Sequence, residues 1–103
     1  TEMNLSEHQE SLKDFIDLWV TWYDENLNRH FSTERDIQIA DTVLELFRLR
    51  ANLESFNKKA LYILIRERTG MKTQFITKVV NIMKAQFEVM YKEYLRTGQL
   101  TEI

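Results

Sequence analysis

The chain of 103 residues contains no proline and only two glycines, Gly70 and Gly98. β-Sandwiches and β-barrels need a turn every few residues, and such turns draw on proline and glycine. Rossmann folds and phosphate-binding loops need several glycines close together. Both classes are therefore excluded, and we expect an all-α fold. The length is typical of a single domain that buries its own core, so residues 1–103 are treated as one helical domain.

Other classes are excluded by what the composition lacks. There is no cysteine, which rules out a disulfide scaffold and thiolate ligands and fits a cytoplasmic location. The apolar stretches are much shorter than the roughly 18 residues that cross a membrane, and the polar, acidic start does not match a signal peptide. His8 and His30 stand far apart without a metal-ligand spacing, so both are expected at the surface. We expect no metal, no cofactor and no enzymatic activity.

Charge divides the chain into two unequal halves. Residues 1–47 carry 3 basic and 11 acidic side chains, a net charge of −8, whereas residues 48–103 carry 11 basic and 5 acidic ones, a net charge of +6. A basic surface attracts phosphate backbones, and an asymmetry of this kind suggests a separate partner for each end. The alternative is that the two halves attract each other, either in the fold or in an oligomer.

Hydrophobic periodicity predicts a small bundle of four helices. The first covers residues 6–30 and is acidic and aromatic, and the second covers residues 33–53 with Ser32 or Thr33 as its cap. Because the second helix is apolar on more than one face, we expect it at the centre of the domain.

The remaining two helices are predicted from the position of the glycines. A segment over residues 57–81 contains a third helix that ends near Thr69, where Gly70 is expected to form a left-handed cap. A long C-terminal helix then covers residues 73–96 and ends at Gly98, leaving a loose tail from Gln99.

Aromatic residues gather in two places. The first helix carries Trp19, Trp22 and Tyr23, and the last one carries a stripe of Phe87, Met90, Tyr91 and Tyr94. Core packing is the expectation for the first set, with a dimer or partner interface as the alternative. The long last helix outruns a small domain, so its second half is expected to pack on the first helix or on another subunit.

Residues 62–81 read YILIRERTGMKTQFITKVVN. Gly70 stands between two helices, and the apolar positions that would hold them together are Ile65, Met71, Ile76 and Val79. This pattern resembles the helix-turn-helix of DNA-binding proteins, in which the second helix enters the major groove. Arg66 stands where that motif usually has a small residue, so its side chain must point outward for the two helices to cross closely.

The resemblance implies a set of DNA-binding residues. The second helix would present polar, non-acidic side chains to the bases and nearby phosphates, namely Lys72, Thr73, Gln74, Thr77, Lys78 and Asn81. The first turn of this helix would also bring backbone N–H groups to a phosphate. Further contacts to the DNA backbone are expected from Lys58, Lys59, Arg66 and Arg68.

The sequence therefore predicts a small DNA-binding transcriptional regulator or accessory factor that reads duplex DNA as a homodimer. A protein partner would bind the acidic N-terminal helix, and no membrane partner is expected. The alternative is a protein–protein adaptor without a nucleic-acid role, whose basic half docks on an acidic surface. Exposure separates the two hypotheses, because a DNA reader must present Gln74, Lys78 and Asn81 on one open face.

Overall fold

The structure, a computed structural model, describes residues 5–49 and 58–102, with only the backbone described for residues 5–10 and Lys58. It contains helices α1 (Leu5–Glu25), α2 (Leu27–His30), α3 (Glu34–Arg48), α4 (Lys58–Thr69) and α5 (Thr73–Thr97). No strand occurs in this described part of the chain, and the predicted all-α fold is confirmed.

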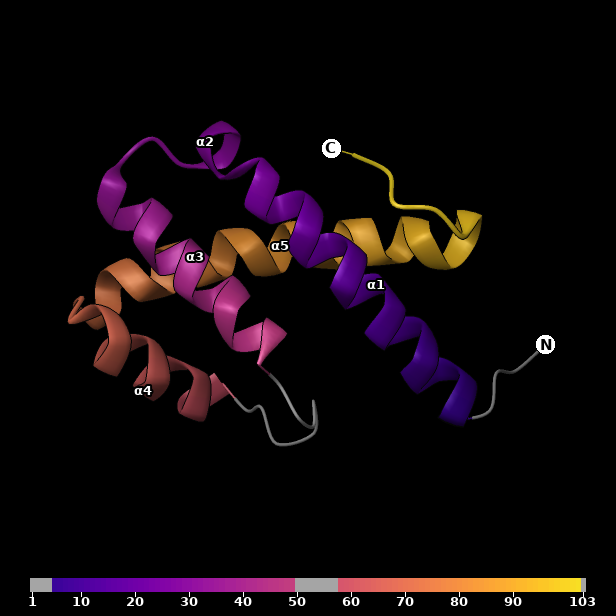
Figure 1. Ribbon diagram of the computed structural model, residues 1–103, viewed down its shortest axis with the longest axis horizontal. Coiled ribbons are helices and arrows are strands. Elements are labelled where there is room, and N and C mark those ends of the chain that lie inside the picture. Colours follow the sequence, from indigo (N-terminus) through magenta and orange to yellow (C-terminus); the bar gives the residue numbers. More distant parts are fainter. Residues whose placement is uncertain (1–4, 50–57, 103) are drawn as a thin grey trace.

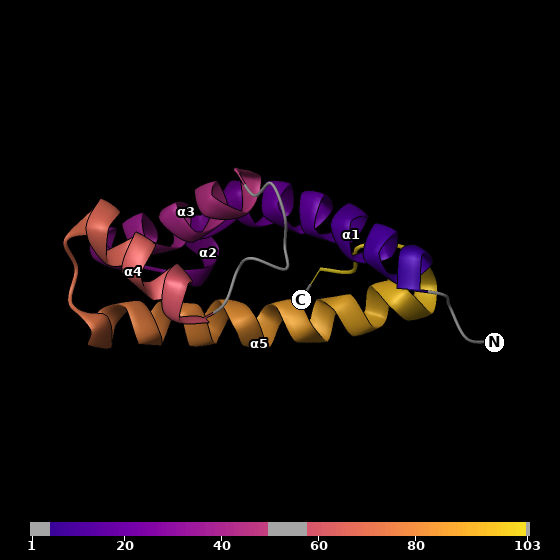
Figure 2. The same cartoon turned by 90° about the horizontal axis from the view of Figure 1, so that it is seen from below.

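The helices form two layers that share one core. Helix α5 lies along one side of the molecule, and α1, α2 and α3 lie on the other, as Figures 1 and 2 show from two directions. Helix α4 spans from one layer to the other at the end where α5 begins (Figure 2). The molecule measures 45 × 29 × 19 Å, and its long axis follows α5.

Helix α3 occupies the centre, as its apolar pattern predicts. It packs against each of the other four described helices. Its buried residues include Ile39, Val43 and Leu44. The Thr33 side chain accepts a hydrogen bond from the Asp36 backbone N–H, which confirms Thr33 as the cap. The helix ends at Arg48, with Leu49 as its C-cap, and the rest of the predicted span to residue 53 lies outside the described residues.

The helix predicted over residues 6–30 is interrupted at Asn26, so the described residues contain five helices where four were predicted. The Asn26 side chain donates a hydrogen bond to the Trp22 carbonyl, at 2.7 Å, and accepts one from Arg29, at 3.0 Å. Its backbone N–H bonds to Tyr23, three residues back, instead of four. A short amide side chain that competes with the backbone in this way breaks a helix. The chain turns there, and α2 leads back toward α3.

Both glycines end helices, as predicted. Gly70 and Gly98 have φ angles of +69° and +77°, in the left-handed region that favours glycine. The N–H of Gly70 donates to the Arg66 carbonyl at 2.8 Å, and that of Gly98 donates to the Tyr94 carbonyl at 2.7 Å. These bonds close the last turns of α4 and α5. The two helices end at Thr69 and Thr97, within one residue of the ends predicted from the sequence.

The aromatic residues form the core between α1 and the second half of α5. Trp19, Trp22 and Tyr23 are buried, which confirms core packing over an exposed interface. Phe15 contacts three rings of α5, with centroid distances of 5.1 Å to Phe87, 5.0 Å to Tyr91 and 5.2 Å to Tyr94. The long helix therefore packs on the first helix of the same chain, which was one of the two predicted arrangements.

His30 and the C-terminal tail depart from the sequence-based expectations. His30 is partly buried rather than at the surface, because the turn at Asn26 stacks its ring on Tyr23, with 4.8 Å between centroids. Its Nδ1 lies 3.1 Å from the Gln86 side-chain nitrogen, and Gln86 also accepts a hydrogen bond from the Tyr23 hydroxyl. The tail is not loose: Leu100 packs against the core, and Trp22 Nε1 donates to Glu102 at 3.0 Å.

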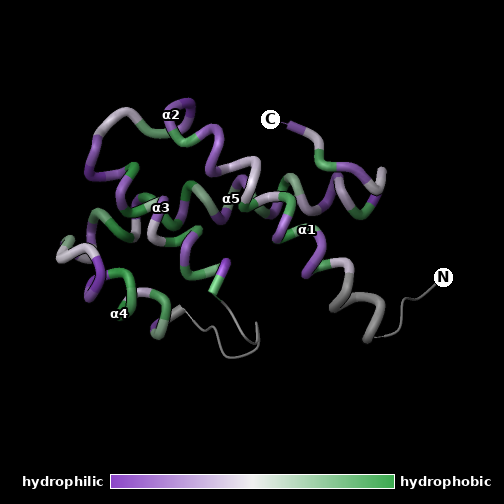
Figure 3. Tube along the Cα trace, in the orientation of Figure 1, coloured by the Kyte–Doolittle hydropathy of each residue, from purple (hydrophilic) through white to green (hydrophobic). Residues whose placement is uncertain are grey.

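Apolar and polar residues are interspersed along α1, α3, α4 and α5, as Figure 3 shows by hydropathy for the coloured part of the chain. Each of these four helices therefore turns its apolar side chains toward the core. Within residues 5–49 and 58–102, no helix is long and apolar enough to span a bilayer.

Candidate nucleic-acid interface

The turn between α4 and α5 is built by local hydrogen bonds around Gly70. The Thr69 hydroxyl donates to the Ile65 carbonyl at 2.7 Å and accepts from the Met71 N–H at 3.1 Å. Gly70 then reverses the chain with its positive φ angle. The outcome is that α4 crosses the start of α5 instead of running alongside it (Figures 1 and 2). Helix α4, with 12 residues, and α5, with 25 residues, thus meet at a short turn that contains a glycine, a feature that a helix-turn-helix also has.

Apolar contacts hold the crossing together at the positions predicted. Ile65, Ile76 and Val79 are fully buried, and Met71 packs against the core beside them. Arg66, which follows Ile65, is exposed, so its long side chain does not separate the two helices. The helix pair is therefore anchored from within, and the opposite side of α5 is left for other contacts.

The predicted base-reading residues gather on the outer side of α5. Lys72, Thr73, Gln74, Lys78 and Asn81 are exposed, whereas Thr77 is partly buried. Gln74, Thr77, Lys78 and Asn81 recur at intervals of three and four residues and therefore share one side of the helix, whereas Lys72 and Thr73 lie at its start. The structure places Asn81 at the rim of a cavity between α5 and its neighbours, which is described below.

The predicted contacts to the DNA backbone are divided between two environments. Lys59 and Arg66 are exposed on α4. Arg68 donates to Glu45 of α3 at 2.8 Å and is thereby engaged in an ion pair. Of Lys58 only the backbone is described, so its predicted role lies outside the described side chains. Among the described residues, no ion pair involves Lys59, Arg66 or Lys72.

A buried carboxylate on α3 organises the edge of this surface. The Asp36 side chain is only 5% exposed and lies 3.0 Å from the Lys78 ammonium, and 3.2 Å from Arg35 Nε. The Arg35 guanidinium also covers the Phe75 ring, 3.9 Å from its centroid. Arg35 of α3 is thereby brought next to the first turn of α5.

Burial raises the pKa of Asp36, but hydrogen bonds from Lys78, Arg35 and Thr33 and the charge of Lys78 outweigh it and lower the pKa below its ordinary value. The Asp36 carboxylate therefore stays ionised at neutral pH. Its charge is balanced by two cations that themselves remain accessible, since the Lys78 side chain is 54% exposed and that of Arg35 37%.

The sequence alone does not indicate the Arg35–Asp36–Lys78 cluster. The cluster joins residues 42 positions apart in the chain, and no local spacing reports such a contact. The excess of basic residues in the second half was the only signal that acidic partners from the first half would be needed.

The charge division of the chain is partly resolved within the fold. Arg48, Arg68 and Lys78 of the basic half pair with Asp24, Glu45 and Asp36 of the acidic half. Part of the basic charge is thus neutralised in the folded protein, as the alternative interpretation of the charge asymmetry supposes. The cations at the turn and on the outer side of α4 remain exposed.

No group of three or more histidine, aspartate or glutamate side chains in the described part of the chain is placed to hold a metal ion. Comparisons with protein-family models, with curated proteins and with solved structures found no match for this chain. The argument for a function therefore depends on the geometry of the α4–α5 surface.

Proposed function

We propose that this protein binds duplex DNA through α4 and α5, as a small transcriptional regulator or accessory factor. The observation that carries the proposal is the exposed, non-acidic outer side of the first turns of α5. Its inner side is fixed in the core by Ile76 and Val79. Helix α5 would lie in the major groove, where Gln74 and Asn81 are suited to adenine and Lys78 to guanine.

Cations around the turn would contact phosphates. Lys72 lies at the start of α5, where the backbone N–H groups and the positive end of the helix dipole favour an anion. Lys59 and Arg66 are exposed on α4, and Arg35 of α3 covers the Phe75 ring in the first turn of α5. Exposed cations on the elements next to the start of α5 would supply the positive charge that a DNA-binding surface needs.

A salt titration of DNA binding tests the proposal. Counterion release gives a log–log slope of about −0.9 for each phosphate neutralised, so the four cations Arg35, Lys59, Arg66 and Lys72 predict a slope of about −3.6. Fluorescence anisotropy with mixed duplex fragments at low salt measures it. Absence of binding at low salt would exclude the proposed function.

Base reading is tested separately from electrostatic attraction. After a preferred site has been selected from random duplexes, Gln74→Ala is expected to cost about 1–3 kcal/mol on that site and little on random DNA. Lys72→Ala is the matched variant two residues away, and it should weaken both DNAs alike and flatten the salt slope by about one unit. Equal losses on both DNAs for Gln74→Ala would leave only a basic surface without sequence recognition.

The proposal includes two partners. A homodimer would present two copies of α5 to half-sites about one turn of DNA apart. The exposed acidic side of α1, with Asp14, Asp17 and Glu25, would bind a further protein. Because the proposed ligand is DNA, the expected location is the cytoplasm of a cell without a nucleus. Sedimentation equilibrium at micromolar concentration, with and without a DNA duplex, tests whether the homodimer forms.

A protein–protein adaptor is the second candidate, and one observation favours it. The ion pairs of Arg48, Arg68 and Lys78 show that acidic surfaces of this fold already attract its basic half. An acidic partner protein would then compete for the same side chains. Selective binding of an acidic polypeptide such as polyglutamate, with no duplex bound at the same ionic strength, is the result expected of an adaptor.

A further inference from the structure

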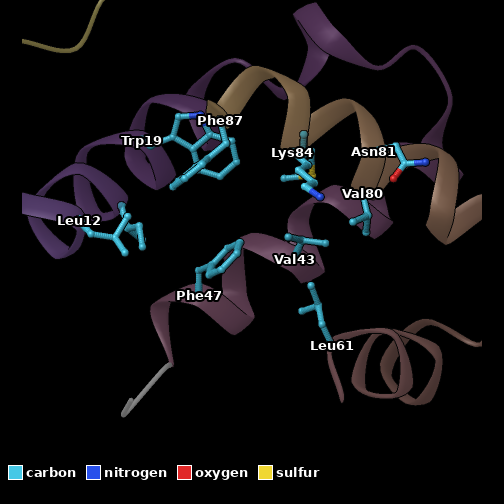
Figure 4. A pocket seen from close by; sticks show the side chains of 11 residues that line it. Leu12, Trp19, Val43, Phe47, Leu61, Val80, Asn81, Lys84 and Phe87 are labelled. Carbon is cyan, nitrogen blue, oxygen red and sulfur yellow. The ribbon is translucent and has the colours of Figure 1, made fainter. Parts of the chain in front are cut away.

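A cavity of about 390 Å³ opens between α1, α3, α4 and α5, and Figure 4 shows the side chains that line it. Its walls are almost entirely apolar. Each helix contributes large side chains, among them Leu12 and Trp19 from α1, Phe47 from α3, Leu61 from α4 and Phe87 from α5. These side chains belong to the core or pack against it, yet they leave a space between them.

Two polar side chains of α5 lie at the rim of this cavity. Lys84 and Asn81 are both exposed, and both belong to the lining. Figure 4 shows the Lys84 side chain reaching among the apolar residues, with Asn81 beside Val80. Among the described residues, no ion pair involves Lys84. The Lys84 ammonium group therefore lies at the edge of an apolar space without a described carboxylate to balance its charge.

Size and charge together define the occupant. The volume lies in the range of sites for single small molecules, which are mostly apolar and carry a few polar groups that fix orientation. A stable protein interface takes about 20–30 residues from each partner, more than the 11 that line this cavity. An apolar cavity of this kind is poorly suited to water, which needs two to four polar partners. The rim cation selects an anionic head group.

We propose that this cavity binds a small amphiphile with a compact apolar body and one carboxylate, such as a medium-chain carboxylic acid. The apolar body lies against Trp19, Phe47 and Phe87, and the carboxylate accepts a hydrogen bond from Lys84. Lys84 is not among the residues of the proposed DNA surface, so this site can be tested independently of that surface.

Calorimetric titration with decanoate tests the site, with 1-decanol and decylammonium as neutral and cationic controls of the same chain length. Decanoate is expected to bind with one molecule per chain and about fivefold more tightly than decanol, because the contact to Lys84 is partly exposed to water. Decylammonium is expected to bind more weakly than both. Fluorescence of Trp19 in the cavity wall should change on binding.

Variants separate the cavity from the head-group contact. Lys84→Met should remove the preference for decanoate over decanol and leave decanol binding unchanged. Lys92→Met, an exposed lysine further along α5, is the matched control and should preserve the preference. Leu61→Trp should fill the cavity and reduce binding of both ligands at least tenfold, with circular dichroism confirming that the helices are retained.

Three results would overturn the proposal. The first is no heat and no fluorescence change with decanoate up to its solubility limit. The second is equal affinity for decanoate and decanol that Lys84→Met does not alter, which would remove the anion from the ligand class. The third is self-association of the protein that Leu61→Trp abolishes while decanoate fails to bind, which would assign the cavity to a second copy of the chain.

Discussion

Helix α5 runs through two regions that differ in what surrounds it. Near its start, Gln74, Lys78 and Asn81 stand in water, and the crossing helix α4 covers only one side. In its second half, Phe87, Tyr91 and Tyr94 pack against Phe15 of α1. One side of α5 is buried along both halves of the helix, so the two regions differ only in how its remaining sides are covered. The second half of α5 belongs to a closed aromatic core, whereas the first half presents an open polar surface whose inner side is anchored in the core.

The largest expected effect is a loss of stability caused by a substitution in the closed region. Phe15→Ala should lower the free energy of unfolding by about 3–5 kcal/mol, because it empties a fully buried site with three ring contacts. Urea denaturation followed by circular dichroism measures it. Gln74→Ala in the open region is the comparison and should change stability by less than about 0.5 kcal/mol. A similar loss for both variants would contradict the contrast between the regions.

A smaller effect compares the two glycines, one in each region. Gly70→Ala and Gly98→Ala should each cost about 1–2 kcal/mol of stability, since both have positive φ angles and an added methyl group meets no atom within 4 Å. Only Gly70→Ala should also weaken DNA binding, because only Gly70 sets the crossing of α4 and α5. Melting curves give the stability, and anisotropy gives the affinity. If Gly98→Ala weakened DNA binding to the same degree, the turn would have no special role.

In the open region, the direction in which Asp36→Asn changes the DNA affinity tests whether Asp36 positions its neighbours. Simple electrostatics predicts tighter DNA binding when a negative charge is removed. If Asp36 holds Lys78 and Arg35 in place, the affinity should instead fall by about threefold, a change typical of partly exposed ion pairs. Glu34→Gln, an exposed carboxylate two residues away, is the control and should follow simple electrostatics. Tighter binding by Asp36→Asn would exclude the positioning role.

The smallest effect is the pH dependence of stability, which differs between the two regions. Burial, followed by the charge of Arg29, lowers the pKa of His30 below its ordinary value of 6.5. The folded state therefore favours neutral His30, and the contribution is complete above pH 6.5 and is lost as the pH falls from there through the lowered pKa. The lowered pKa of Asp36 acts in the same direction, but only below its ordinary value of 3.8.

Urea midpoints measured between pH 7 and pH 5 should therefore fall, and His30→Gln should flatten this slope. Asp36→Asn should leave the slope in that window unchanged and alter it only below about pH 4. A slope that His30→Gln does not affect would assign the titration to another group.

The features predicted from the sequence are those fixed by neighbouring residues. A glycine after an amphipathic segment signals a left-handed cap, and both Gly70 and Gly98 form one. Thr33 before two acidic residues signals a helix start, and it caps α3. Burial of Ile65, Ile76 and Val79 followed from their helical spacing. Exposure of Gln74, Lys78 and Asn81 follows from the same helical spacing.

The features that escaped prediction depend on contacts between distant residues. Asn26 has no flanking glycine or proline to mark the break that it makes, and the break is what buries His30. Nothing near Glu102 in the chain points to Trp22, 80 residues away. The cavity beside Lys84 is a property of four helices together, because it exists only where their side chains fail to meet. DNA binding itself remains a hypothesis that the exposed face of α5 supports.

The unbroken course of α5 has a consequence for chain length. Its 25 residues rise about 37 Å, and each residue turns the helix by about 100°. One residue inserted between Asn81 and Phe87 would rotate the first half by that angle relative to the aromatic anchor, and Gln74 would leave the solvent face. Seven residues make nearly two full turns and restore the phase, at the expense of moving the two ends about 10 Å further apart. The open and closed ends are thus held in a fixed angular relation, and α5 accepts changes of length only in steps of whole turns.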